Sequence, residues 1–269
     1  MSAPQAIAIA VVAVGVLTPA VAAEPVHLYA AGSLRPALSE IATAFEASHG
    51  DKVAATFGAS GLLKDQIVAG APADVFASAN LEHPRALAEA KRAAPVVLFA
   101  RNRLCALVRA GLTVEPATVL DRMLDPAVKL GTSTPRADPS GDYAWAVFRR
   151  ADALRPGALA ALETKALQLT GGPSSPVPPP GRTVYGMLLE QGAADLFLTY
   201  CTTAVAARAE NPAQQVVVLP DALAVGADYG LTVMRSASPA AYQFALFILS
   251  AEGQRILARH GFAVPNLPE

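Results

Sequence analysis

The chain has 269 residues, of which 53% are hydrophobic and 16% are charged, and its formal net charge is −1. This composition is typical of a soluble globular protein of one or two domains and argues against wholesale disorder. A near-neutral chain without blocks of like charge gives no indication of a basic surface for nucleic acid or anionic lipid. We therefore expect no nucleic-acid partner.

The N-terminal segment differs from the rest of the chain. Residues 6–23 carry no charge, and Ala20-Val21-Ala22 is a small-x-small ending of the kind that precedes cleavage by signal peptidase. Residues 1–5 contain no Lys or Arg, so an uncleaved anchor is the alternative. We interpret residues 1–23 as a signal peptide and expect the mature protein in the periplasm. No other apolar run approaches the roughly 20 residues of a membrane-spanning helix.

The two cysteines, Cys105 and Cys201, are far apart in the sequence. They could pair in an exported protein, but two residues do not make a disulfide framework, and their spacing is not that of metal ligands. The preferred interpretation is two small buried hydrophobic residues, and the sequence leaves open whether they pair.

Predicted strands and helices alternate along the chain. Leu34, Leu38, Ile41 and Phe45 have helical spacing, whereas short apolar runs such as 26–30 are typical of buried strands. The predicted strands are 26–30, 52–57, 74–78, 95–108, 128–131, 194–200 and 215–219, and the predicted helices are 34–48, 62–69, 82–90, 143–153, 156–169, 183–191 and 242–260. This alternation predicts βαβ units and mainly parallel sheets flanked by helices.

The long β-rich run 95–108 is a natural crossing between two lobes. We expect an α/β fold whose first lobe comprises residues 24–100 and 227–269 and whose second lobe comprises residues 101–226. The segment 171–181, GGPSSPVPPPG, holds five prolines and can form neither a helix nor a central strand. It is predicted to be an extended surface loop.

Two stretches, YAAGSLRPAL and FGASGLLKDQ, place a lone Ser (Ser33 and Ser60) between a predicted strand and a predicted helix. A Ser at a helix start accepts from a helical N–H and keeps its own O–H free to donate, and the first turn of the helix favours a negative charge. Asp138-Pro139-Ser140-Gly141 and Gly181-Arg182-Thr183 precede two further helices. Any single Ser of this kind usually only caps its helix. Four such starts, beyond the carboxyl ends of strands, predict an anion site built largely from neutral donors.

The order AAGSLRPAL…FGASGLLKDQIVAGAPADVFASAN resembles the periplasmic molybdate-binding proteins of ABC transporters. The resemblance continues through DPSGDYA, the strand that ends at Tyr200, and EGQRILARHGF, and it covers nearly the whole mature chain. It implies a two-lobed type II periplasmic binding-protein fold with a ligand cleft between the lobes. It also implies a monomeric binding protein that captures molybdate or tungstate and delivers it to an ABC permease at the inner membrane. Such a protein is not an enzyme and has no cofactor.

The resemblance also implies which residues bind the anion. By position, Ser33 and Ser60 would donate hydroxyl and backbone N–H groups from the first lobe. From the second lobe, Ser140 and Arg182 would donate backbone N–H groups, and Tyr200 would donate its hydroxyl.

Asp138 departs from the common pattern, which has an apolar residue at this position. Its DPSGDY setting is similar to an archaeal molybdate/tungstate branch in which an Asp and a Glu approach the metal centre of the oxyanion. The matching Glu is absent, because Thr199 precedes Tyr200. We keep Asp138 among the expected ligand-binding residues and expect no bare metal cation.

Three alternatives remain open. Another small anion, such as sulfate, phosphate, arsenate or an organic acid, would use the same donors, and Asp138 could accept a hydrogen bond from the proton that phosphate keeps. A secreted hydrolase is less favoured, because residues 58–62 end in Leu and do not form a G-x-S-x-G elbow, and the four histidines are scattered. Asp138 and Asp142 on one loop suggest Ca²⁺ only weakly, since further oxygen ligands are missing.

Overall fold

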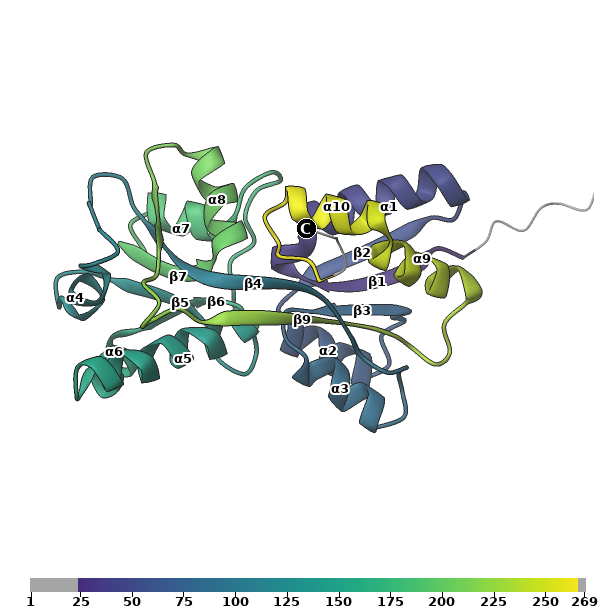
Figure 1. The fold of residues 1–269 in the computed structure, drawn as a ribbon, viewed down its shortest axis with the longest axis horizontal. Coiled ribbons are helices and arrows are strands. Elements are labelled where there is room, and N and C mark those ends of the chain that lie inside the picture. Colours follow the sequence, from purple (N-terminus) through teal and green to yellow (C-terminus); the bar gives the residue numbers. More distant parts are fainter. Residues whose placement is uncertain (1–23, 266–269) are drawn as a thin grey trace, which may run out of the picture.

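The computed structural model describes residues 24–265. Figure 1 shows two lobes arranged along the long axis of the molecule, with β4 (Val97–Val108) and β9 (Gly226–Val233) running between them. The predicted signal peptide, residues 1–23, lies outside the described residues. Within residues 24–265, no helix is long and apolar enough to cross a membrane.

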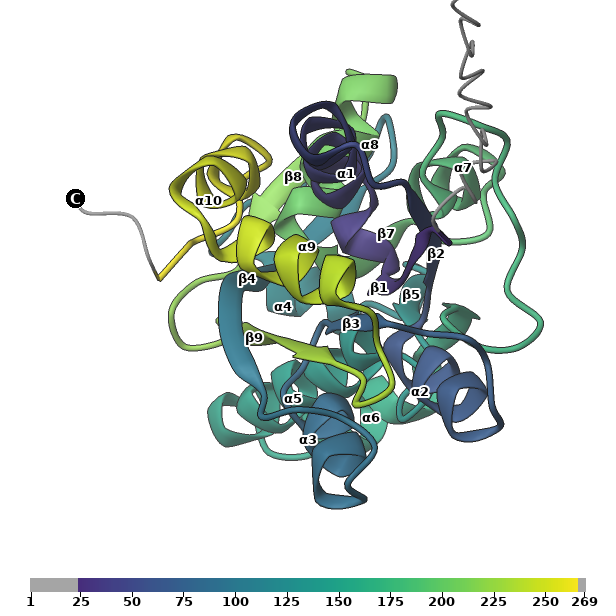
Figure 2. The ribbon, with the colours of Figure 1, turned by 90° about the vertical axis from the view of Figure 1, so that its right-hand side faces the viewer.

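In the first lobe, β1 pairs in parallel with β2 on one side and with β3 on the other, and β9 lies antiparallel to β3. Helices cover both faces of this sheet (Figures 1 and 2). The strands are β1 (Val26–Ala31), β2 (Val53–Gly58) and β3 (Val75–Ser78); the helices are α1 (Arg35–His49), α9 (Pro239–Leu249) and α10 (Ala251–Arg259) on one face, and α2 (Ser60–Val68) and α3 (Glu82–Glu89) on the other.

The second lobe repeats this plan with its own parallel strands. β5 pairs in parallel with β6 and with β7, and β4 lies antiparallel to both β7 and β8. The strands are β5 (Leu130–Ser133), β6 (Leu167–Thr170), β7 (Leu196–Tyr200) and β8 (Gln215–Val218), and the helices are α4 (Val119–Leu124), α5 (Pro139–Leu154), α6 (Ala158–Lys165), α7 (Val184–Glu190) and α8 (Cys201–Glu210).

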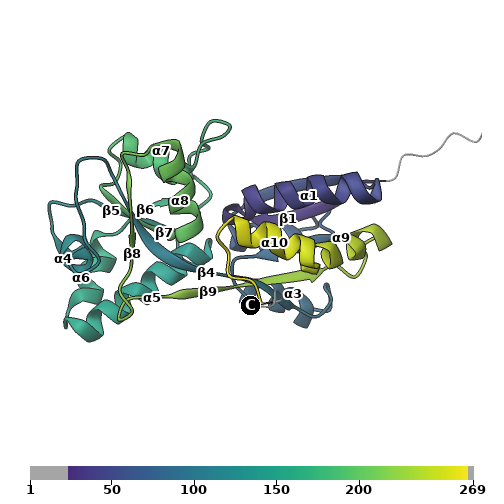
Figure 3. The same cartoon turned by 45° about the horizontal axis from the view of Figure 1, so that its top comes forward.

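β4 connects the two lobes because its two halves pair with different strands. Residues 97–103 pair with β9, whereas residues 104–108 pair with β7. One hydrogen-bonded path, β2-β1-β3-β9-β4-β7-β5-β6, therefore runs through both lobes, and Figure 3 shows β4 and β9 as the segments that join them. The predicted two-lobed α/β fold is confirmed, with sheets that are mixed rather than mainly parallel.

The core of the first lobe follows the predicted apolar periodicity. The stripe formed by Leu34, Leu38, Ile41 and Phe45 along the first helix is completely buried. Phe45 packs edge-on against Phe244 of α9, with ring centroids 5.1 Å apart. Segments far apart in the sequence thus close one core, and α9 and α10 belong to the first lobe.

Several elements depart from the predictions. Residues 156–169 were expected to be one helix, but α6 ends at Lys165 and Leu167–Thr170 forms β6 at the edge of the second sheet. Pairing with β5 decides this change, because it satisfies backbone groups that a helix would otherwise pair internally. The sequence patterns did not predict α4, α8 or β9. The proline-rich segment 171–181 is free of helix and strand, as predicted.

The interpretation of the cysteines was wrong. Cys105 and Cys201 form a disulfide, with Cα atoms 4.9 Å apart. Cys105 lies in β4, opposite Thr199 of β7, and Cys201 follows the last residue of β7. The antiparallel pairing of β4 with β7 brings together two residues separated by 96 positions, which their spacing in the sequence could not indicate.

Candidate functional site

The carboxyl ends of β1, β2 and β3 meet at one edge of the first lobe. Ala31 lies opposite Gly58, and Ala30 lies opposite Ala77. The short helical turn Gly32–Leu34 follows β1, and α2 begins at Ser60 directly after β2. The parallel register therefore places Ser33 and Ser60 on the same edge, as expected for a ligand site in an open α/β sheet.

Ser33 contacts the second crossing strand. Its Oγ lies 2.9 Å from the hydroxyl of Tyr229 in β9. The Tyr229 hydroxyl also receives a long hydrogen bond, 3.5 Å, from Nδ2 of Asn102 in β4. Tyr229 is completely buried, and burial raises the pKa of its phenol far above the ordinary value, so it remains protonated at neutral pH.

Ser60 is oriented by a backbone donor. Its side chain is buried, and its Oγ accepts the N–H of Ala79, just after β3, at 3.1 Å. Because the oxygen is an acceptor in this contact, the hydroxyl proton of Ser60 stays free to donate to another group. Ser60 thus has the geometry expected of a group that donates a hydrogen bond to a bound anion.

Tyr200 ends β7 in the second lobe and is 3% exposed. Its ring packs edge-on against Tyr229 and Tyr143, with centroids 5.6 and 6.3 Å away. Its hydroxyl is buried and makes no hydrogen bond of ordinary geometry to any residue between 24 and 265. Burial also raises the pKa of Tyr200, with the neighbouring Tyr229 contributing, so the phenol keeps its proton and can donate.

Asp138 caps α5 and lies at the start of the second-lobe helix that faces α2. Its Oδ1 accepts the N–H of Ser140 at 3.1 Å. Burial raises the pKa of the Asp138 carboxyl to about 6, although the Ser140 N–H and the Ser133 hydroxyl oppose the shift. The residue retains some exposed surface, but Gly171 packs against its carboxyl so closely that a Cβ at position 171 would lie 2.7 Å from Oδ2.

Ser140 is not arranged as expected. The backbone N–H that should donate to a ligand donates to Asp138 instead. Its Oγ is buried and has no hydrogen-bond partner within the described part of the chain. Asp138 is the N-cap residue of α5 and departs from the family pattern described above. Its carboxylate accepts the N–H that Ser140 was expected to donate to the ligand.

The two lobes touch where these residues lie. The N–H of Gly61, in the first turn of α2, donates to the carbonyl of Ala137 at 2.9 Å. The hydroxyl of Tyr143 in α5 donates to the carbonyl of Ala79 at 3.2 Å. A Cβ at Gly61 would lie 2.5 Å from the Arg136 carbonyl oxygen, so glycine is needed for this approach. The structure therefore brings the start of α2 and the start of α5 together across the lobe boundary.

Arg182 is not brought to this boundary. Its backbone N–H donates to the carbonyl of Pro179 at 3.1 Å. Its exposed guanidinium pairs with Glu190 at 2.5 Å and with Glu210 at 3.1 Å. These two carboxylates raise the pKa of Arg182 and hold it on the outer surface of α7 and α8.

Sequence reasoning did not identify Asn102, Tyr143 or Tyr229. Asn102 interrupts the apolar crossing run 95–108, which was a weak polar signal. Tyr229 lies opposite Ala100 only because β9 pairs with β4. Since β9 itself was not predicted, this contact could not be found from the sequence.

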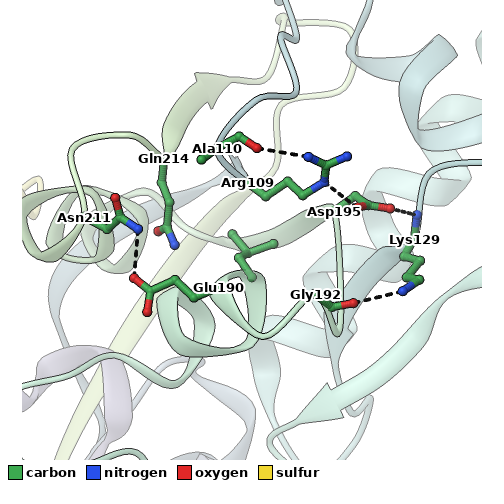
Figure 4. Close-up of a pocket in the computed structure, with 9 residues that line it drawn as sticks. Arg109, Ala110, Lys129, Glu190, Gly192, Asp195, Asn211 and Gln214 are labelled. Carbon is green, nitrogen blue, oxygen red and sulfur yellow. Dashed lines mark hydrogen bonds and ion pairs between the residues drawn. The ribbon is translucent and has the colours of Figure 1, made fainter.

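A cavity of about 510 Å³ opens on the second lobe, away from the lobe boundary (Figure 4). It lies at the amino ends of the parallel strands, because Lys129 precedes β5 and Asp195 precedes β7, whereas Tyr200 lies at the carboxyl end. Arg109 pairs with Asp195 at 2.6 Å, and Lys129 donates to the Gly192 carbonyl at 2.9 Å. The positively charged side chains of Arg109 and Lys129 in this cavity thus already bind other groups of the protein.

Residues 24–265 contain no group of three or more His, Cys, Asp or Glu residues that could hold a metal ion. Asp142, the second carboxylate of the suggested Ca²⁺ loop, accepts the backbone N–H of Arg136 at 2.9 Å. Both loop carboxylates therefore accept hydrogen bonds from backbone N–H groups near the start of α5.

Comparison with known proteins agrees with the fold. Residues 26–263 match the family described as "Bacterial extracellular solute-binding protein". An uncharacterized protein of Pasteurella multocida (strain Pm70) is 35% identical over 241 residues, covering 89% of this chain and 99% of that protein. The molybdate-binding protein ModA of Escherichia coli (strain K12) is 27% identical over 252 residues, covering 89% of each chain.

Among solved structures, the sulfate-binding protein SubI of Mycobacterium tuberculosis H37Rv has a TM-score of 0.74 and 21% identity, covering 90% of this chain and 87% of that one. At this identity the likeness concerns the fold, which is that of type II periplasmic binding proteins. The family match spans nearly all of the described residues. The chain therefore belongs to the bacterial extracellular solute-binding protein family.

Proposed function

We propose that this protein captures a tetrahedral oxyanion between its two lobes, molybdate or tungstate in the first place, and delivers it to the permease of an ABC importer. The observation that carries the proposal is the hydroxyl of Tyr200, which is buried at the lobe boundary without a partner among residues 24–265. A buried donor without an acceptor costs about 1–3 kcal/mol, and an anion placed there would supply the acceptor.

The chemistry of the neighbouring groups supports a compact anion that carries no proton. Ser60 accepts from a backbone N–H, so its hydroxyl donates outward. Ser33 and Tyr200 supply two further neutral hydroxyls, and the first turn of α2 favours negative charge. Molybdate, tungstate and sulfate offer acceptors in all directions, which is what such a set of donors requires. The 27% identical molybdate-binding protein supports molybdate as the first candidate.

A second candidate, phosphate or arsenate, is favoured by Asp138. These anions keep a proton near pH 7 and need an acceptor. The Asp138 carboxylate is enclosed at the start of α5, and its pKa of about 6 leaves it mostly ionised at neutral pH. In the proposed site, the hydroxyls of Ser33, Ser60, Ser140 and Tyr200 bind the anion, and the Asp138 carboxylate accepts a hydrogen bond from a ligand that carries a proton. Arg182 is left out because its donors are engaged elsewhere.

The proposal includes a hinge in the two crossing strands. β4 changes its partner from β9 to β7 between Arg103 and Leu104, which supports the predicted lobe boundaries near residues 101 and 226. Opening and closing about these strands would bring the start of α5 to the start of α2, as the Gly61–Ala137 hydrogen bond does in this structure. We propose a periplasmic monomer that binds without a cofactor or catalysis.

The test is isothermal titration calorimetry of the mature protein, residues 24–269, with molybdate, tungstate, sulfate, phosphate, arsenate and a small carboxylate. We expect stoichiometric binding with the highest affinity for molybdate or tungstate. Preference for phosphate or arsenate would favour the second candidate. Failure of every oxyanion to bind the folded protein would contradict the proposed function.

A further inference from the structure

A chain of polar side chains leads from the hinge strands to Ser33. Nδ2 of Asn102 donates to Oγ1 of Thr202, near the start of α8, at 2.8 Å, and to the hydroxyl of Tyr229 at 3.5 Å. The Tyr229 hydroxyl in turn lies 2.9 Å from Oγ of Ser33. Asn102 lies in β4 and Tyr229 in β9, so both crossing strands contribute. These contacts connect Ser33, through Tyr229 in β9, to the side-chain amide of Asn102 in β4.

The amide of Asn102 fixes the direction of the hydrogen bonds that it makes itself. Its Oδ1 accepts the backbone N–H of Arg103 at 2.9 Å, which identifies the other end of the amide as the NH₂ group. An amide NH₂ can only donate. The Tyr229 oxygen therefore accepts from Asn102, which leaves its own proton for the Ser33 oxygen 2.9 Å away, a contact in which either atom can donate. When Tyr229 donates, Ser33 accepts, and the hydroxyl proton of Ser33 is left for the ligand.

We propose that Asn102 and Tyr229 act through Ser33 as specificity-determining residues, and that they hold its hydroxyl as an obligate donor. This inference rests on the proposed function and defines the ligand class of that site more narrowly. An obligate donor matches an oxyanion that carries no proton, such as molybdate, tungstate or sulfate. Against phosphate or arsenate, a ligand proton directed at Ser33 would meet another donor, which leaves both groups unpaired in a buried site.

Ser60 supports this reading from the other side of the site. Its oxygen also accepts from the protein, from the Ala79 N–H, and its proton is likewise directed outward. The two serines therefore reach the same polarity by different means, one through a backbone donor and one through Asn102 and Tyr229. The backbone donor cannot be changed by a side-chain substitution, whereas the second arrangement can be reversed by mutation.

The first variant is Tyr229→Phe, which keeps the ring and removes the donor to Ser33 without changing the charge. Ser33 can then rotate and accept a ligand proton. We expect the ratio of molybdate affinity to phosphate affinity, measured by calorimetric competition at pH 7, to fall about 3- to 10-fold. Tyr242→Phe, a partly exposed tyrosine of α9 remote from the site, is the matched control and should leave the ratio unchanged.

The second variant is Asn102→Asp, which replaces the donor by an acceptor of nearly the same shape. Tyr229 would then donate to Asp, and Ser33 would donate to Tyr229 and accept from the ligand. We expect the affinity ratio to fall at least about tenfold. The added negative charge also disfavours dianions, so the double variant Asn102→Asp/Tyr229→Phe separates the two effects. If charge alone causes the fall in the affinity ratio, the double variant should have the same ratio as Asn102→Asp. If the reversed hydrogen bonds through Tyr229 cause it, the double variant should recover part of the parent's ratio.

Far-UV circular dichroism and thermal unfolding show whether each variant is folded. If the parent binds molybdate and the folded Tyr229→Phe and Asn102→Asp proteins keep its affinity ratio within about twofold, Ser33 is not controlled by these residues and the inference is overturned. A parent protein that binds no oxyanion overturns the proposed function itself, and the inference with it. The two failures are therefore distinguishable.

Discussion

The two lobes present different kinds of groups to the boundary between them. In the first lobe, the oxygens of Ser33 and Ser60 are already in contact with Tyr229 and with the Ala79 N–H. In the second lobe, the hydroxyls of Ser140 and Tyr200 are buried without partners among the described residues. The first lobe is therefore preorganised by its own hydrogen bonds, whereas the second lobe carries unsatisfied donors.

This difference indicates how binding energy is distributed. A donor already held in place by protein contacts needs little reorganisation when a ligand arrives, but its contacts also stabilise the ligand-free fold. An unsatisfied donor destabilises the ligand-free fold by about 1–3 kcal/mol and recovers that cost on binding. We therefore expect substitutions of the first-lobe donors to lower both stability and affinity. Substitutions of the second-lobe donors should lower affinity without lowering the stability of the ligand-free protein.

The largest expected effect on stability concerns the disulfide of the second lobe. In Cys105→Ala/Cys201→Ala, β4 and the start of α8 lose their covalent link, and we expect the free energy of unfolding to fall by about 2–5 kcal/mol. Urea denaturation of the parent and the double variant, each with and without reductant, measures this. Reductant should destabilise the parent only; an equal effect on the variant would contradict a role for the disulfide.

The next effect tests whether the lobes must approach each other. Gly61→Ala would place a Cβ 2.5 Å from the Arg136 carbonyl oxygen and prevent the contact between α2 and the start of α5. Binding would then lose the donors of the second lobe, and we expect affinity to fall at least about 100-fold. Calorimetry measures the affinity, and small-angle scattering with and without molybdate measures compaction.

Gly58→Ala is the control for this variant. Its Cβ would meet Leu63 of the same lobe at 3.4 Å, an ordinary contact, and affinity should stay near that of the parent. If Gly61→Ala binds molybdate as tightly as Gly58→Ala does, the approach of the lobes is not needed for binding.

A smaller effect compares single hydroxyls from the two lobes. Tyr200→Phe removes an unpartnered donor, so affinity should fall about 10- to 100-fold while the ligand-free protein is as stable as the parent or more so. Ser60→Ala should weaken binding by a similar factor, but it also leaves the Ala79 N–H without its acceptor and should lower stability.

Thermal unfolding together with calorimetry separates these variants. Arg182→Ala removes only surface ion pairs, and its affinity should stay within about threefold of the parent. Equal stability losses in Tyr200→Phe and Ser60→Ala would remove the contrast between the lobes.

The smallest effect concerns the pH dependence of stability. The Asp138 carboxyl has a pKa of about 6 in the folded protein and an ordinary value of 3.8. Between these values the folded state binds more protons than the unfolded state, so stability should fall as pH rises from about 4 to about 6 and remain reduced above it.

Asp138→Asn keeps an oxygen to cap α5 but cannot ionise. It should be more stable than the parent by about 1–2 kcal/mol at pH 7.5, with the difference vanishing near pH 4. Urea denaturation at pH 4, 5.5 and 7.5 measures this difference. A constant difference across the three pH values would show that the burial of Asp138 does not govern the profile.

Local sequence patterns predicted most of the alternating elements, the crossing at residues 95–108 and the serines at helix starts. These features depend on local periodicity and on the chemistry of helix termini, which a short stretch of chain already contains. The buried stripe from Leu34 to Phe45 and the proline-rich loop 171–181 follow from the same local rules.

Contacts between residues distant in the chain could be found only in the folded structure. The disulfide between Cys105 and Cys201, the position of Tyr229 beside Ser33, and the engagement of Arg182 by Glu190 and Glu210 all depend on the pairing or packing of distant elements. The short spacing of Asp138 and Ser140 allowed their contact, yet only burial of the carboxylate beside Gly171 raised its pKa. Local rules fix which groups can donate, but the register of β4 with β7 and β9 fixes which donors meet, because a partner across a sheet has no fixed separation in sequence.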